Sequence, residues 1–160
     1  MPDYRVKRPT KRDQFIERAL DRPADAYADA LDHGDEQKVL DQMTPGQRWL
    51  TAWYFYWDDV TNGGHEQYFS NYTGNLWSLA VEATSRLHTP EAPVLREAVS
   101  LFPDGQPAAT EEARREQLEQ VDLERLADLD ERFYALPGSA EVVQGYIESN
   151  LDDFFIDDGA

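Results

Sequence analysis

The sequence predicts an all-α fold, a single-domain bundle of about eight short helices around an aromatic central helix. Strand-like alternation of apolar and polar residues is nearly absent, whereas segments with helical periodicity follow one another with short breaks. Residues that typically begin and end helices separate these segments. One segment near the middle is apolar on nearly all sides, as expected of a helix that its neighbours bury. The chain of 160 residues suits one domain, which we expect over residues 10–160.

The first third of the chain predicts a basic arm and three helical segments. Residues 1–9 form the arm, which we expect to be extended. The helix that follows should end just before Pro23, because a proline suits the first turn of the next helix. That second helix should end near His33, and residues 36–43 should form a short third one.

The central helix has a clear start at Thr44-Pro45-Gly46-Gln47: a threonine cap, proline at the first helical position and glutamine at the third. It should run to about Thr61 and stop at Asn62-Gly63-Gly64, where the residues tolerate the left-handed conformation that ends a helix. Its apolar face should pack in the core and not stack nucleic-acid bases, because the net charge disfavours nucleic acid. On a helical wheel this face consists of Trp49, Trp53, Trp57 and Val60, extended by Leu50 and Tyr54.

Six further helical segments follow, and capping or turn residues separate them. Asn75, Thr110, Asp122 and Ser139 are the expected N-caps. The acidic tail over residues 152–158 contains three apolar residues, which either dock on the domain or belong to a frayed end. The six segments are expected over about residues 65–71, 75–87 and 91–102, from residue 110, and over about 122–136 and 139–150.

Acidic residues outnumber basic ones by 32 to 15, which gives a net charge of −17. Five of the bases fall in the first twelve residues, so residues 13–160 carry 31 acids against 10 bases, a charge of −21. Such a surface repels nucleic acid and anionic lipid and attracts basic proteins. We therefore expect no direct nucleic-acid binding and no membrane association. The expected partner is a basic DNA-binding protein, such as a transcription factor or a nuclease.

Cysteine is absent, and no segment has the pattern of a signal peptide or a membrane span. These features predict a cytoplasmic protein and exclude disulfides, thiolate metal sites and cysteine nucleophiles. The three histidines lack metal-binding spacing, and no serine lies in a nucleophile-elbow sequence. We expect neither an enzyme nor a cofactor or metal site.

One acidic row has a regular spacing of four residues. It consists of Asp13, Glu17, Asp21, Asp25 and Asp29, with Asp32 and Glu36 beyond. On a continuous helix its neighbours lie about 6 Å apart along the axis, whereas each DNA strand shows one phosphate per ~3.4 Å. We expect Pro23 to divide the row into two pieces at an angle. We assign these seven acids, with Asp58, Asp59 and Glu66, to a partner-binding surface, and a solvated face is the alternative.

A second acidic stretch follows Thr110. Its acids are Glu111, Glu112, Glu116 and Glu119, and Arg114, Arg115 and Arg125 interrupt it. Ion pairs within the helix explain this stretch without a partner.

The segment after the central helix predicts a structural corner. Its side-chain amides can hydrogen-bond exposed backbone, and its aromatic residues can anchor the turn in the core. The acids that flank the glycine pair disfavour a bound anion. The residues of this structural motif are Asn62, Gly63, Gly64, Gln67, Phe69 and Asn71.

Several motifs in order resemble a bacterial all-α domain family of formerly unknown function that includes acidic DNA-mimic proteins. They are the aromatic helix, Asn62-Gly63-Gly64-x-x-Gln67-Tyr68-Phe69-x-Asn71, Leu101-Phe102-Pro103, and Asp130-Glu131-Arg132-Phe133-Tyr134-Ala135-Leu136. The resemblance covers about residues 40–155. It implies an acidic protein that occupies the DNA-binding surface of a transcription factor.

Other readings of the charge remain open. The protein could be an immunity-type inhibitor that covers the basic active site of a nuclease toxin. It could also be a salt-adapted protein without a mimicry role, in which acidity maintains solubility. The basic arm could pair with the acidic body of a second copy, which would give a homodimer.

Overall fold

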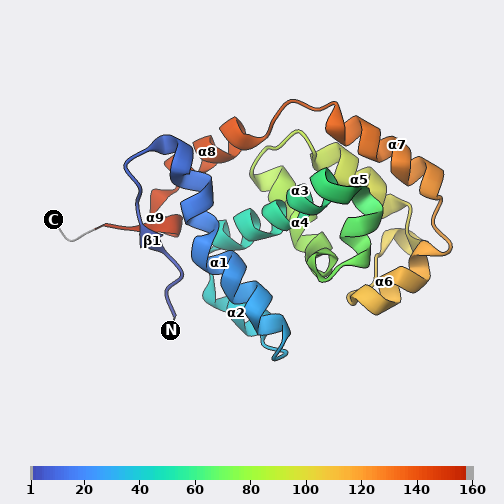
Figure 1. Cartoon of the computed structure of the whole chain (residues 1–160), viewed down its shortest axis with the longest axis horizontal. Coiled ribbons are helices and arrows are strands. Elements are labelled where there is room, and N and C mark those ends of the chain that lie inside the picture. Colours follow the sequence, from blue (N-terminus) through green and yellow to red (C-terminus); the bar gives the residue numbers. More distant parts are fainter. Residues whose placement is uncertain (1, 158–160) are drawn as a thin grey trace. The chain divides into compact units, whose positions relative to one another are not determined.

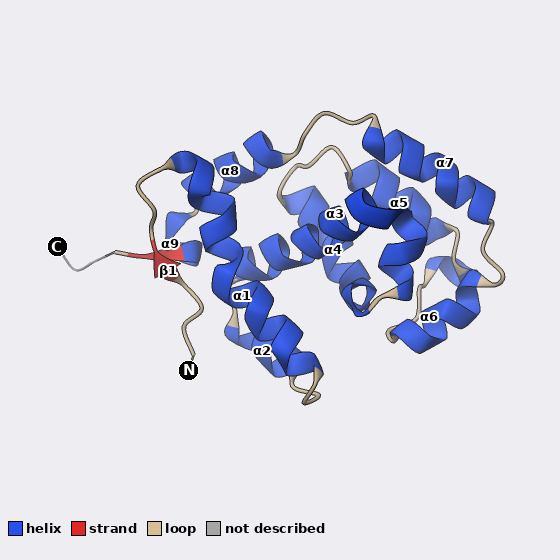
Figure 2. Ribbon diagram, in the orientation of Figure 1, coloured by secondary structure: helices blue, strands red, loops and turns tan. Residues whose placement is uncertain are grey.

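The computed structural model describes residues 2–157, and helices dominate its fold (Figure 1, Figure 2). Its Cα packing divides the chain into two compact units. Unit 1 comprises residues 1–51 and 139–160, and unit 2 comprises residues 52–138. Apart from one sheet of two short strands, the regular elements of the described residues are helices, so the predicted all-α class is confirmed.

Unit 1 brings together the N-terminal and C-terminal parts of the chain. α1 packs against α2 and α8, and β1 pairs with β2. The elements of this unit are β1 (Val6–Lys7), the 3-10 helix η1 (Arg12–Gln14), α1 (Phe15–Leu31), α2 (Glu36–Gln42), the first turns of α3 (Pro45–Ser70), α8 (Ala140–Ser149), α9 (Leu151–Phe154) and β2 (Phe155–Ile156).

The two strands of unit 1 are parallel, and Val6 lies opposite Phe155. They are too short to show the alternation by which strands are recognised in a sequence, so the sequence does not predict them. Their pairing fixes the described part of the basic arm against the end of the chain. Phe154 and Phe155 are 0% and 4% exposed, so the aromatic residues of the acidic tail dock. Asp158 lies outside the described residues.

The predicted break at Pro23 is wrong, because α1 continues through this proline and is 17 residues long. Proline inside a helix removes one hydrogen bond and crowds the carbonyl four residues earlier, which costs about 3 kcal/mol or more. Here that carbonyl belongs to Ala19, and both residues are buried. They lie in an apolar stripe with Leu20, Tyr27 and Ala30, and the packing of this stripe offsets the cost.

α3 begins with the predicted capping box. The Gln47 amide donates to Thr44 Oγ1 at 3.2 Å, and the Thr44 amide donates to Gln47 Oε1 at 3.0 Å. The helical conformation is interrupted at Gly64, whose φ of 83° and ψ of 179° are accessible essentially to glycine alone. The expected stop over three residues is therefore a kink at one residue, after which the helix continues to Ser70.

Unit 2 consists of the rest of α3 and the elements that follow it. α5 packs against α4 and α7. Thr110 and Asp122 cap α6 and α7 through their side chains, as predicted. Asn75 is not an N-cap, because α4 begins after Leu76. The elements after α3 are η2 (Tyr72–Leu76), α4 (Trp77–Arg86), α5 (Ala92–Ser100), η3 (Pro103–Gly105), α6 (Glu111–Leu118) and α7 (Leu123–Tyr134).

α3 is buried on more sides than its predicted apolar face. Trp53 and Val60 of that face are buried, whereas Trp57 is half-buried and stacks on Trp53 with 5.8 Å between ring centroids. Tyr56 lies off the face and is nevertheless fully buried, with its ring 5.1 Å from that of Tyr68. Leu50, Trp53 and Val60 of the predicted face therefore lie in the core, whereas its other three residues, Trp49, Tyr54 and Trp57, are only half-buried.

Candidate partner-binding surfaces

The α1 acidic row, defined as Glu17, Asp21, Asp25 and Asp29, lies on one continuous helix, and all four side chains are exposed. Because Pro23 does not break the helix, the row extends over about 18 Å at 1.5 Å per residue. Asp13 in η1 precedes it, Asp32 follows it, and both are exposed. The structure therefore places six of the predicted acids on consecutive segments of unit 1.

The other four predicted acids lie outside this row. Glu36 begins α2 and is half-buried. Asp59 accepts hydrogen bonds from Gln67 Nε2 at 3.1 Å and from a threonine hydroxyl, so its carboxylate is engaged within unit 2. Asp58 and Glu66 are exposed. Partial burial, followed by the charge of Asp59, raises the pKa of Asp58.

The corner after α3 is closely packed around its second glycine. A Cβ atom on Gly64 would lie 2.4 Å from Asp130 Oδ2, so only glycine fits there. Phe69 is fully buried, and its ring centroid lies 4.6 Å from that of Phe102. Asn62 and Gly63 of the motif are exposed. The motif thus has exposed residues on one side and, on the other, buried residues that pack into unit 2.

Three polar side chains form a hydrogen-bonded series beneath this corner. Asp130 Oδ1 lies 2.6 Å from His65 Nδ1 and also accepts the His65 amide at 2.8 Å. Tyr56 Oη lies 2.7 Å from His65 Nε2. Burial, and then the charges of neighbouring groups, raises the pKa of Tyr56 well above its ordinary value. The phenol therefore stays protonated, and the Asp130 carboxylate accepts a hydrogen bond from Nδ1 of His65.

A tyrosine, a histidine and a carboxylate in series could relay a proton in an enzyme. Here His65 is 0% exposed and both of its ring nitrogens are engaged, so no nitrogen is open to a substrate. The series instead orients the backbone at the kink. The sequence analysis did not assign this role, and its only signal is that His65 and Asp130 both lie within the motifs that carry the family resemblance.

Arg114 departs from the interpretation that the bases of α6 form intrahelical ion pairs. Its side chain is fully buried. The guanidinium donates to the carbonyl oxygens of Phe69 and Asn71, both at 2.8 Å, and of Ala108 at 3.0 Å, and to Asn75 Oδ1 at 2.8 Å. One cation thus fixes the chain on both sides of the turn that follows α3.

The α6–α7 acidic rows were not among the predicted site residues. They comprise Glu112 and Glu116 on α6 with Glu119 at its C-cap, and Glu124, Asp128 and Glu131 on α7. Spacings of three and four residues place each set on one helix face, and all six side chains are exposed. None of them forms an ion pair with another described residue, and the neighbouring Arg115 and Arg132 pair instead with Glu111 and Glu97. The spacing of these acids is visible in the sequence, but the sequence analysis treated Arg114 as a surface charge that interrupts the acidic stretch.

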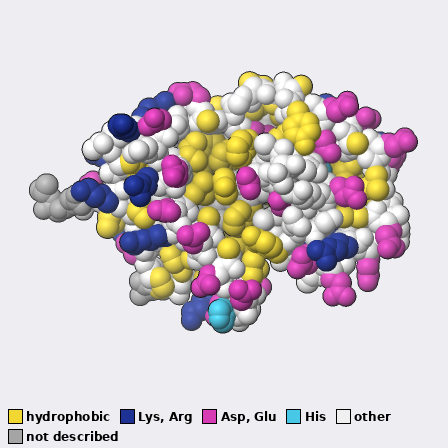
Figure 3. Space-filling view, in the orientation of Figure 1, with side chains coloured by type: hydrophobic (Ala, Val, Ile, Leu, Met, Phe, Trp, Pro, Cys, Tyr) yellow, Lys and Arg dark blue, Asp and Glu magenta, His cyan; other side chains and the backbone are white. Residues whose placement is uncertain are grey.

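The two units differ in the charge that they present. On the face shown in Figure 3, basic side chains gather over the N-terminal elements of unit 1, whereas acidic side chains predominate over unit 2. Among residues 2–157, no group of three or more histidine, cysteine or acidic side chains is placed to hold a metal ion. No helix in that part of the chain is long and apolar enough to cross a membrane.

These features define an all-α protein with rows of exposed carboxylates, six of which form no ion pair with another described residue. A comparison with protein-family models matches residues 41–150 to the family described as DMP19-like protein. The match spans more than half of the chain, so the chain belongs to the DMP19-like family, which consists of DNA-mimic binding proteins and not of enzymes. The resemblance stated from the motifs is thereby confirmed. Comparisons with curated proteins and with solved structures found no match.

Proposed function

We propose that this protein mimics DNA: it binds the DNA-binding surface of a basic partner, such as a transcription factor, and keeps DNA from that surface. The observation that carries the proposal is the coincidence of the family match with unpaired acidity. The matched residues 41–150 contain 19 acids against 7 bases, a charge of −12. One of the seven bases, Arg114, and one of the 19 acids, Glu91, are buried, so burial leaves the excess of acids in this region unchanged.

The α6–α7 acidic rows are the primary contact in this proposal. They lie inside the matched region, and none of their six carboxylates is paired with another described residue. Unpaired carboxylates keep their full attraction for a basic surface, whereas a paired one must first give up its partner.

The α1 acidic row is the secondary contact. It lies outside the matched residues, and Asp21 is 3.8 Å from Arg18. Its carboxylates stand about 6 Å apart along the axis, which is about half the linear charge density of one DNA strand. A single row of this kind complements only part of a surface built for DNA.

The attraction should act mainly during encounter. Clusters of like charge steer an oppositely charged partner and raise the association rate, and salt weakens this effect. We therefore expect fast association that falls as the ionic strength rises from low to physiological values.

The partner can be found and the proposal tested in one sequence of steps. The protein, immobilised through a tag, captures proteins from a native lysate; bound proteins are eluted with salt and identified by mass spectrometry. Each basic DNA-binding protein so identified is then loaded with labelled duplex DNA, and unlabelled protein is added. We expect the DNA to be released. A partner that binds the protein and still holds its DNA normally would refute mimicry, and a captured nuclease that loses activity would identify the inhibitor alternative.

A further inference from the structure

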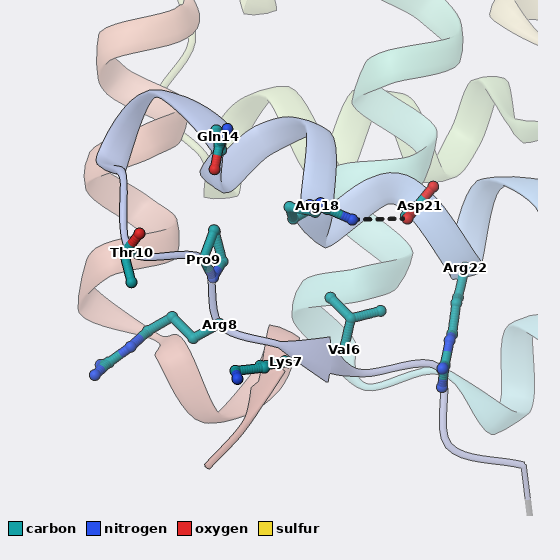
Figure 4. Close-up of a pocket in the computed structure, with 9 residues that line it drawn as sticks. All are labelled: Val6, Lys7, Arg8, Pro9, Thr10, Gln14, Arg18, Asp21 and Arg22. Atoms are coloured by element: carbon teal, nitrogen blue, oxygen red, sulfur yellow. Dashed lines mark ion pairs between the residues drawn. The ribbon is translucent and has the colours of Figure 1, made fainter. Parts of the chain in front are cut away.

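Unit 1 contains a basic pocket whose cations have no role in the proposed function. The pocket lies between the N-terminal arm and α1 and has a volume of about 440 Å³ (Figure 4). Lys7 and Arg8 come from the arm, and Arg18 and Arg22 come from the helix. Asp21 is the only acid among the lining residues, so four cations and one carboxylate line the pocket in a chain where acids outnumber bases by 32 to 15.

Two of these cations, Arg8 and Arg22, form no ion pair with another described residue. Arg8 makes no ion pair or hydrogen bond with the other described residues. Arg22 makes one hydrogen bond, from Nη1 to the carbonyl oxygen of Arg5 at 3.4 Å, and no ion pair within residues 2–157. Arg18 lies 3.8 Å from Asp21, and its side chain is 56% exposed, so that contact is weak.

Two other arginines of the same segment differ from these cations, because each is paired with a carboxylate of the chain. Arg12 donates to both carboxylate oxygens of Glu141, at 2.8 and 3.0 Å, and also contacts Glu148. Arg5 hydrogen-bonds Asp3 and lowers the pKa of that carboxyl to about 2. Arg8 and Arg22 have no such carboxylate partner among residues 2–157, although acids are abundant in the chain.

Both walls of the pocket are held in place before any ligand arrives. The arm is fixed by the pairing of β1 with β2 and by a hydrogen bond from Arg5 Nη1 to the Asp152 carbonyl oxygen at 3.2 Å. The opposite wall is the continuous helix α1. A site whose walls are already ordered loses little conformational entropy on binding.

We propose that this pocket binds a small ligand through its phosphate groups. Guanidinium groups match the geometry of phosphate oxygens with paired hydrogen bonds, and Thr10 and Gln14 in the lining can donate to the remaining oxygens. A phosphate group carries more charge than a carboxylate and so gains more from several cations.

The acidity of the rest of the chain restricts the size of this ligand. At physiological ionic strength, charges are screened beyond about 8 Å, so a ligand confined to the pocket interacts mainly with the pocket cations. A long nucleic acid would extend over surfaces whose carboxylates repel it. Inorganic polyphosphates and organic phosphate esters share the chemistry that the pocket recognises.

Isothermal titration calorimetry with tripolyphosphate and with ATP, without metal ions and at low salt, tests the proposal. We expect both to bind the full chain; similar affinities would show that the phosphate chain is sufficient, and tighter ATP binding would indicate an organic ester. Arg18→Gln combined with Arg22→Gln should weaken binding at least tenfold, because each lost charge-assisted hydrogen bond is worth about that factor. The matched control is Arg96→Gln on α5, an exposed arginine of unit 2, which should leave the affinity unchanged.

Asp21→Asn provides a test that misfolding cannot imitate. Removing the one acid of the lining should strengthen binding by about two- to fivefold, the range expected for an exposed charge pair. The proposal is overturned if neither probe binds the wild-type chain at millimolar concentration. It is equally overturned if the double variant binds as tightly as wild type, or if Arg96→Gln weakens binding as much as the double variant does.

Discussion

Both units carry exposed ion pairs, but unit 2 also buries an arginine and a histidine. In unit 1 the ion pairs lie at the surface, as between Arg12 and Glu141. In unit 2, Arg114 and His65 are fully buried, and their hydrogen bonds hold the corner after α3. An exposed pair exchanges water for a partner and gains little, whereas a buried polar group that loses its partner is costly. The buried groups of unit 2 therefore contribute to stability, whereas exposed acids contribute little to it and remain available to bind a partner.

The largest expected effect comes from Arg114. Replacing it by leucine leaves three backbone carbonyls and an asparagine side chain without their buried donor. We expect the free energy of unfolding, measured by urea denaturation, to fall by about 3–5 kcal/mol. Arg115→Leu on the exposed side of α6 is the control and should cost much less. Equal losses of unfolding free energy for the two variants would contradict the claim that the buried cation stabilises the fold more than the exposed one does.

The next effect concerns the kink in α3. Gly64→Ala places a Cβ 2.4 Å from Asp130 Oδ2 and forces a glycine-only backbone conformation, so we expect a loss of about 1–3 kcal/mol. Gly145→Ala on α8 of unit 1 meets no atom within 4 Å and should stabilise the protein by about 0.5–1 kcal/mol. Thermal unfolding would show opposite shifts of the midpoint. A stabilising Gly64→Ala would mean that the kink does not require glycine.

A smaller effect depends on pH. Burial raises the pKa of Glu91, which is 2% exposed, above its ordinary value of 4.5. The folded state therefore holds this proton to a higher pH than the unfolded state does, and stability from this group falls as the pH rises from about 4.5 through the folded pKa. Glu91→Gln should remove this dependence. Urea denaturation at several pH values should show the variant gaining stability relative to wild type from acid to neutral pH, and parallel curves would contradict the effect.

The smallest effect is expected in unit 1. Arg12→Gln removes an exposed contact with Glu141 and Glu148, and we expect only a slight fall in the midpoint of thermal unfolding. A loss comparable to that of Arg114→Leu would show that surface pairs hold unit 1 together, and the contrast between the units would fail.

Local signals made much of the fold predictable. Thr44, Thr110 and Asp122 cap their helices through side chains within three residues of the groups that they bind, so the sequence alone identifies them. Pro23 was misread because the packing that tolerates it comes from residues elsewhere in the chain. The β1–β2 pairing was missed for a related reason, since it joins segments from the two ends of the chain.

The candidate surfaces were predictable only in part. The exposed α1 acidic row follows from its spacing. The acids of α6 were attributed to ion pairs within the helix, because the sequence does not say that Arg114 points into the unit while its neighbour Arg115 faces solvent. The acids of α7 were not assigned to any surface. Helical periodicity distinguishes faces, but it cannot show which face of a polar helix is buried when that face carries an arginine.

The most direct test of the account titrates DNA displacement from the captured partner, by fluorescence anisotropy, with wild type and two variants that each lack four charges. One carries Glu112→Gln, Glu116→Gln, Glu124→Gln and Asp128→Asn, and the other carries Glu17→Gln, Asp21→Asn, Asp25→Asn and Asp29→Asn. We predict that wild type displaces DNA, that the first variant needs at least tenfold more protein, and that the second needs less extra protein than the first. Displacement that is unchanged in both variants, or DNA that stays bound at saturating wild type, would contradict the account.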